Sequence, residues 1–265
     1  MDSARDAYDD FVALDWQVEL GADEAIRDAP INRYELENKP RKIATNKSQD
    51  TGKKAPAFTP VETPKVDVVA AAKTAASTAK TLDDLKAAIG AFPHCNIKRG
   101  ARNMIFAEGL QDARVMVITD FPSREEDRAG TMCAGPEGPL FDRMFAAIDL
   151  SRTTNAPQNA LYIVNAVPWH VPQNRKLTRD ELGIWGVFLM RHIEIVNPEV
   201  ILLAGNVSCE MLLKKSGVSR LRGDWKEALT RPVLPFLPAS RVLQNPALKR
   251  EAWADLLSLK SKLGK

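Results

Sequence analysis

The segment PVLPFLPASRVLQNPALKREAW, residues 232–253, contains the transition that decides the fold. A short apolar run enters a Pro-Ala-Ser loop, and an amphipathic helical pattern follows. This order is typical of an α/β domain, in which the loop after each strand presents polar side chains to a ligand. This loop begins with Leu237, and an apolar side chain at a position expected to be polar needs an explanation.

The same alternation of apolar runs and helical patterns extends backwards through the chain. The runs are ARVMVITD, LYIVNAV, EVILLAG and RPVLPFL, and the helical segments lie near residues 138–149, 178–196, 206–215 and 246–263. Apolar runs without strict alternation indicate buried parallel strands covered by helices on both faces. We therefore predict a three-layer α/β/α domain with a central four-stranded parallel sheet. Its ligand site should lie beyond the carboxyl ends of the strands, after Thr119, Asn165, Gly205 and Phe236.

The first part of the chain has a different character. Residues 3–20 have helical spacing of apolar side chains, which predicts a helical extension within residues 1–38 and a docking segment for a protein partner. Residues 39–69 are rich in Lys, Pro, Thr and Ala, which indicates a basic disordered linker. The main domain is then expected to comprise residues 70–265.

Composition restricts the class of protein. The 265 residues are 45% hydrophobic and 27% charged, and no apolar run reaches the length of a membrane span. The acidic N-terminus is unlike a signal peptide, so we expect a cytoplasmic location and no membrane partner. The net charge of +3 is too small to indicate nucleic-acid binding by itself. Cys95, Cys133 and Cys209 form no CxxC pair, which predicts reduced thiols rather than a disulfide framework or metal cage.

Two polar residues end predicted strands and are candidates for chemistry. Asp120 either caps a helix or turn, or contributes a carboxylate to a site. Asn165 can both donate and accept hydrogen bonds, as reading the edge of a base requires, or can satisfy a turn. No GxGxxG or Walker pattern is present, so a nucleotide cofactor is not indicated.

Motifs along residues 92–263 together resemble a known family. They are FPSREEDRAG, GPLFDRMFAAIDLSR, YIVNAVPWHVPQNRKLTRDEL, HIEIVNPEVILLAG, SRLRGDW and LPASRVLQNPALKREAWADL. In order and spacing they resemble the bacterial iron-sulfur uracil-DNA glycosylases, which are type 4-like. This resemblance implies a DNA-repair protein of α/β/α fold that flips deoxyuridine out of DNA and hydrolyses its glycosidic bond.

The resemblance also assigns roles to residues of the loops. Asp120 stands where the family has a glutamate that positions water, and Asn165 where an asparagine reads uracil. Cys133 stands at the position of a stacking phenylalanine, and Leu237 at that of a histidine that stabilises the departing uracil anion. The implied base pocket therefore comprises Phe121, Pro122, Cys133 and Asn165.

The departures from the family pattern affect the expected activity. Loss of one charge-stabilising donor typically lowers a rate about 10² to 10³-fold, so uracil excision should be weak or absent. Ser240 and His170 are the candidate replacements, although Ser240 also suits a turn or helix cap and His170 a merely exposed position. Two hypotheses follow: a glycosylase with weak or altered base excision, or a non-catalytic DNA- or protein-binding module on a glycosylase fold.

The family's iron-sulfur ligands have also changed. The resemblance places them at Phe92, Cys95, Trp169 and Trp185, of which only one is a cysteine. A cluster needs several thiolate ligands, so we expect no cofactor and no metal, with the aromatic rings filling the volume.

Basic residues within the motifs are the candidates for DNA contact. Arginine and lysine on loops at one edge of the sheet can bind phosphate without reading sequence, or can form a solvated face. The candidates are Arg175, Lys176, Arg220, Arg222 and Arg241.

Overall fold

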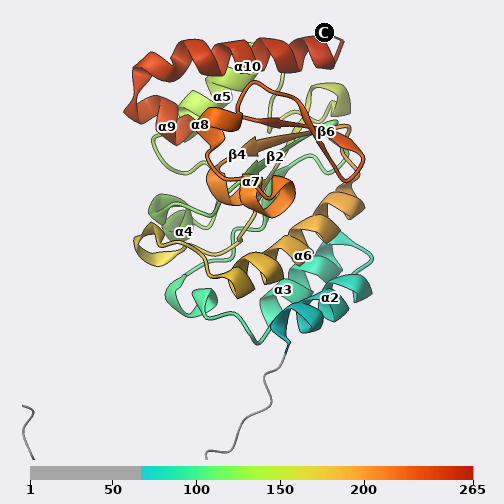
Figure 1. Cartoon of the computed structure of the whole chain (residues 1–265). Coiled ribbons are helices and arrows are strands. Elements are labelled where there is room, and N and C mark those ends of the chain that lie inside the picture. Colours follow the sequence, from blue (N-terminus) through green and yellow to red (C-terminus); the bar gives the residue numbers. More distant parts are fainter. Residues whose placement is uncertain (1–66, 265) are drawn as a thin grey trace, which may run out of the picture. The chain divides into compact units, whose positions relative to one another are not determined.

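The computed structural model describes residues 67–264, which contain one mixed β-sheet of order β1-β3-β2-β4-β6-β5 (Figure 1). Its centre is formed by parallel strands, and this confirms the predicted four-stranded core: β2 Val115–Thr119, β3 Leu161–Asn165, β4 Val200–Ala204 and β6 Arg231–Pro235. The edge strands β1 Ala107–Gly109 and β5 Lys226–Ala228 pair antiparallel with β3 and β6. The sequence did not predict them because three residues are too few for a visible apolar pattern.

Helices cover both faces of the sheet, as predicted (Figure 1). Side chains at alternate positions of a strand face opposite ways, so Met116 and Ile118 pack on one face while Val115 and Val117 pack on the other. The first face is covered by α2 Val68–Thr78, α3 Leu82–Ala91, α6 Arg179–Val196 and α7 Asn206–Leu213. The second face is covered by α5 Gly138–Ala146, α9 Ala239–Gln244 and α10 Lys249–Lys262.

Short helices connect these elements. They are α4 Arg124–Ala129, α8 Val218–Leu221, and the 3-10 turns η2 Ile97–Gly100, η3 Pro157–Asn159, η4 Pro172–Asn174 and η5 Pro246–Leu248. Capping boxes begin α3 at Thr81, α4 at Ser123 and α6 at Thr178, where each side chain accepts from the backbone three residues on. Helix α2 begins at Val68, inside the range predicted as linker. The predicted N-terminal helix and most of the linker lie outside the described residues.

The strand register brings the predicted loops together. Thr119 at the end of β2 lies opposite Asn165 of β3 and Ala204 of β4. Because these strands are parallel, the segments that follow them leave the sheet at the same edge. Among residues 67–264, no helix combines the length and apolar character that crossing a membrane requires.

Substitution of Trp185 in α6 tests how tightly the core on the first face of the sheet is packed. Its side chain is 1% exposed and its ring centroid lies 5.9 Å from that of Phe188. Trp185→Ala should lower the free energy of unfolding by about 3 to 5 kcal/mol, because a large cavity replaces the ring. Trp253→Ala is the matched control, since Trp253 is 43% exposed and should cost far less. Urea denaturation followed by circular dichroism measures both, and equal losses would contradict the packing described.

Candidate functional site

A cleft of about 1050 Å³ opens at the carboxyl ends of the parallel strands. Thr119 of β2, Ile163 of β3 and Ala204 of β4 contribute to its wall, together with the loops that follow β2, β3 and β6. The structure brings most of the predicted site residues into this cleft: Asp120, Phe121, Pro122, Cys133, His170 and Ser240. The volume is ample for a nucleotide.

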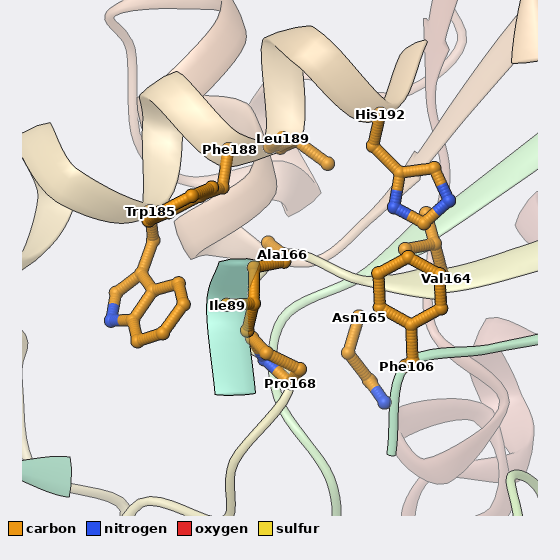
Figure 2. A pocket seen from close by; sticks show the side chains of 10 residues that line it. All are labelled: Ile89, Phe106, Val164, Asn165, Ala166, Pro168, Trp185, Phe188, Leu189 and His192. Carbon is orange, nitrogen blue, oxygen red and sulfur yellow. The ribbon is translucent and has the colours of Figure 1, made fainter. Parts of the chain in front are cut away.

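Asn165 does not line this cleft. Its side chain is buried, its Oδ1 accepts a hydrogen bond from Thr119 Oγ1 (2.6 Å), and its Nδ2 donates to the carbonyl of Ile105 (3.2 Å). It lines a separate cavity of about 10 Å³ together with Phe106 and His192 (Figure 2). Such a cavity is about the size of one water molecule, so a base does not fit there.

The small cavity has an apolar wall with one neutral histidine. His192 stacks on Phe106 at 4.6 Å between ring centroids, and its Nε2 is 2.8 Å from the hydroxyl of Tyr162. Burial lowers the pKa of His192 to about 3, so the ring is uncharged at neutral pH. These contacts describe a satisfied core histidine rather than an acid or base for catalysis.

Leu237 also points away from the cleft. It is 0% exposed and belongs to the apolar core beneath α5, α9 and α10, together with Phe145 and Phe236. The backbone N–H of Phe236 still donates to the carbonyl of Leu203 at 2.8 Å, so the β-ladder continues up to the loop. The apolar residue at the loop mouth is therefore explained by packing.

Asp120 lies in the cleft wall, but its carboxylate caps α7. Oδ2 accepts from the backbone N–H of Asn206 at 2.8 Å, and Oδ1 accepts from the backbone N–H (2.9 Å) and hydroxyl (3.1 Å) of Ser208. A carboxylate also suits the positive end of a helix dipole. These bonds occupy most of the roughly four acceptor positions of a carboxylate, so little capacity remains for a water.

Gly205 makes this cap possible. A Cβ atom at this position would lie 2.0 Å from Asp120 Oδ1, so any side chain would displace the carboxylate. Burial raises the pKa of Asp120, and the hydrogen bonds from Ser208 and Asn206 partly oppose that rise. The space left by Gly205 and the hydrogen bonds from Asn206 and Ser208 therefore fix the position of the carboxyl group.

Three further polar groups face the cleft. His170 Nδ1 lies 2.8 Å from the carbonyl oxygen of Pro122; because a carbonyl only accepts, Nδ1 carries the hydrogen and Nε2 is left for a ligand. Ser240 is an exposed residue in the first turn of α9. Burial raises the pKa of the Cys133 thiol to about 12, against the opposing effect of Arg152, so Cys133 is not a thiolate nucleophile at neutral pH.

Comparison with known proteins identifies the family. A family model described as the uracil DNA glycosylase superfamily matches residues 106–257, which include the sheet and all four segments that follow its parallel strands. The chain belongs to the uracil-DNA glycosylase superfamily.

Its relatives place it near one branch of that superfamily. It is 30% identical over 174 residues to a type-4 uracil-DNA glycosylase of Thermotoga maritima, covering 63% of this chain and 86% of that protein. It is 26% identical over 196 residues to a type-4 enzyme of Archaeoglobus fulgidus, covering 70% and 95%. A DNA polymerase of Bacillus phage SP01 also matches, at 26% identity over 156 residues, but over only 16% of that polymerase. The type 4-like resemblance is thereby confirmed.

The positions at which the resemblance places cluster ligands do not fit an iron-sulfur cluster. Phe92, Cys95, Trp169 and Trp185 are all at least nine-tenths buried in the core on the α6 face, and Phe188 packs its ring against both Phe92 and Trp185. Only Cys95 has a sulfur ligand, and burial raises the pKa of its thiol. Within the described residues no group of His, Cys, Asp or Glu side chains has the arrangement of a metal site.

Two of the basic residues predicted to contact DNA are engaged inside the protein. The Arg175 guanidinium makes two hydrogen bonds to the Glu181 carboxylate, at 2.6 and 2.8 Å. Arg222 binds Asp255 through Nε at 2.8 Å and through Nη2 at 2.7 Å, and Asp255 is only 2% exposed. The other candidates have exposed side chains: Lys176, Arg220 and Arg241.

The structure adds cleft residues that the sequence analysis missed. Gln173 and Asn174 line the cleft with backbone φ of 57° and 49°, a left-handed conformation that is uncommon for glutamine. Arg102, Arg124 and Arg128 line it as well. The spacing of Arg124 and Arg128 by four residues was a usable signal, because it places both on one face of a helix.

Substitution of Asp120 tests its role as the cap of α7. Asp120→Ala removes the acceptors for Asn206 and Ser208 and should lower the free energy of unfolding by about 1 to 3 kcal/mol. Asp120→Asn retains an acceptor oxygen and should cost less. Because the folded pKa of Asp120 is raised, its own contribution to stability should fall as pH increases from the ordinary carboxyl pKa through the folded one, so the stability difference between wild type and Asp120→Asn should change over that range. Thermal unfolding between pH 3 and 7 measures both effects; indistinguishable stabilities of the Ala variant and wild type would contradict the cap.

Arg222→Met tests the buried ion pair. It leaves the Asp255 carboxylate uncompensated and should lower the free energy of unfolding at pH 7 by about 3 kcal/mol. Burial already raises the pKa of Asp255 while Arg222 opposes the rise, so the loss should shrink at acid pH, where Asp255 becomes neutral. Denaturant unfolding at pH 5 and 7 measures this change. Arg220→Met, an exposed neighbour, is the control and should be close to neutral; a pH-independent loss for Arg222→Met would contradict the assignment.

Proposed function

We propose that this chain is a DNA-binding protein of DNA repair or DNA metabolism in which uracil excision is weak or absent. The observation that carries this proposal is the position of the Asp120 carboxylate, which caps α7 through hydrogen bonds from Asn206 and Ser208. The same group would otherwise be the one to orient a water toward the glycosidic carbon. A carboxylate that has most of its acceptor positions occupied by the fold does this poorly.

Two further side chains support weak excision. Leu237 lies in the core and can donate no hydrogen bond to a departing base anion, which typically costs about 10² to 10³ in rate. Asn165 bonds to Thr119 and Ile105 beside a cavity of about 10 Å³, so the fold already engages both the oxygen and the nitrogen of its amide. Each position that the family resemblance assigned to chemistry has a partner within the fold.

A second candidate function is excision of an altered base through His170. His170 lines the cleft, and its hydrogen bond to the Pro122 carbonyl fixes the ring and leaves Nε2 for a ligand. In the protonated ring Nε2 donates a hydrogen bond, which could stabilise negative charge on a departing base. This arrangement would support slow excision of such a base.

The non-catalytic alternative includes a protein partner bound by the N-terminal helix. That helix lies outside the described residues, so this partner remains a prediction from sequence. It differs from the first proposal in requiring no DNA affinity of the main domain.

A single-turnover assay tests the proposed function. Excess protein is incubated with labelled oligonucleotides that each contain one deaminated base, with a type-4 enzyme as positive control. The expected rate on deoxyuridine is at least about 10²-fold below that control. Any residual activity should vanish in His170→Gln if the second candidate function is correct. Excision at the rate of the control, unaffected by His170→Gln, would overturn both.

Leu237→His tests whether the family's histidine can simply be restored. The position is 0% exposed and in the core, so an imidazole there would be buried without a partner. We expect no gain in excision and a loss of at least about 2 kcal/mol in the free energy of unfolding. Leu237→Met should be tolerated, because it conserves volume. A folded Leu237→His variant with increased excision would show that this side chain reaches the cleft.

A further inference from the structure

Three arginines form a cluster on the wall of the cleft. Arg124 and Arg128 are exposed residues four apart on α4, so their side chains lie on one face of that helix. Arg102 is an exposed residue in the segment that follows η2. All three line the same cleft as Asp120 and His170. We call them the cleft arginines.

Backbone hydrogen bonds hold these arginines beside one another. The Asp127 carboxylate of α4 accepts from the backbone N–H of Arg102 at 2.9 Å and from that of Asn103 at 3.0 Å. Asn103 Nδ2 donates in return to the carbonyl of Asp127 at 2.6 Å. Arg102 is thus anchored through its backbone, which leaves its guanidinium available to a ligand.

The acids of α4 are used by the fold itself. Glu126 is 9% exposed and accepts from the backbone N–H of Ser123 at 2.8 Å and of Cys133 at 2.6 Å. Asp127 is 6% exposed and carries the bonds to Arg102 and Asn103. The REEDR sequence therefore contains more acids than bases, but its exposed charges are two arginines and Glu125.

The guanidinium groups of the cleft arginines have no carboxylate partner within residues 67–264. Five acidic residues line the cleft beside the three arginines: Asp120, Glu125, Glu126, Asp127 and Glu137. The carboxylates of Asp120, Glu126 and Asp127 accept hydrogen bonds from backbone N–H groups, so the acids without such a bond are Glu125 and Glu137. By contrast, Arg175 and Arg222 are each bonded to an internal carboxylate, which a phosphate would have to displace. The guanidinium groups of the cleft arginines are therefore more available to an anion than those of Arg175 and Arg222.

We propose that Arg102, Arg124 and Arg128 bind phosphodiester groups of DNA next to a nucleotide held in the cleft. This inference rests on the proposed function, because it assumes that DNA is the ligand. A guanidinium presents paired N–H donors that match two phosphate oxygens, which makes arginine well suited to this contact. The contact supplies affinity and orientation without reading sequence.

The test compares two triple variants of the full chain. Arg102→Gln, Arg124→Gln and Arg128→Gln are combined in one, and the matched control combines Lys73→Gln, Lys86→Gln and Arg250→Gln, exposed residues of α2, α3 and α10 that do not line the cleft, which removes the same charge elsewhere. Binding to a fluorescent DNA oligonucleotide, single- and double-stranded, is measured by anisotropy from 0.05 to 0.2 M salt. Near-ultraviolet circular dichroism checks that each variant retains the native fold; glutamine preserves the backbone anchors of Asp127.

The cleft variant should bind on the order of 10-fold or more weakly at the lowest salt, and its plot of log affinity against log salt should be flatter by about 2 to 3. The control variant should change less in both quantities. If the cleft variant bound DNA as tightly as the wild-type protein and with the same salt dependence, this inference would be overturned. An equal loss of affinity in the control variant would also overturn it. Either result would leave the proposed DNA binding intact. No binding by the wild-type protein would overturn both.

Discussion

The hydrogen bonds between the Asp120 carboxylate and the first turn of α7 set the geometry of the cleft. They join the end of β2 to the segment that leaves β4, and they require Gly205, where any Cβ would displace the carboxylate. The two central strands thus end in a shared, internally satisfied polar contact. Because these bonds use most of the acceptor positions of the Asp120 carboxylate, little of its capacity is left for a ligand or a water in the cleft.

The same competition between folding and catalysis recurs at the other family positions. The Asn165 amide is bonded to Thr119 and Ile105, and Leu237 is packed in the apolar core. At the positions of the cluster ligands, aromatic rings fill the interior where thiolates would be needed. At each of these positions the fold itself engages the side chain. The chain thus combines the architecture of the superfamily with site positions whose side chains are bonded or packed within the fold.

In α4, hydrogen bonding also decides which charged side chains reach the surface. The two acids that α4 buries accept hydrogen bonds from backbone N–H groups, and this leaves its arginines on the surface. A segment that is acidic by count can therefore present a basic face. Net charge, which is +3 for the whole chain, conveys none of this, because it does not distinguish satisfied from available groups.

The parallel core, the helices on both faces and the loops that build the cleft were predictable from sequence, because apolar periodicity and strand-helix alternation are local patterns. The edge strands β1 and β5 were not, since three residues carry too little pattern and their pairing depends on β3 and β6. The site residues also include a part that could be predicted from sequence and a part that could not. Their positions after the strands could be read from the chain, and so could the family.

The sequence by itself determined the α/β architecture and the superfamily, and it placed Leu237, Trp169 and Trp185 where the resemblance expects a histidine and two cysteines. Only the tertiary structure decided that Asp120 caps α7, that Leu237 faces the core, and that Arg222 is paired with Asp255 while Arg102 faces the cleft. The physical reason is that a side chain's partner is usually distant in sequence. Asp120 and Ser208, or Arg222 and Asp255, meet only when the chain has folded.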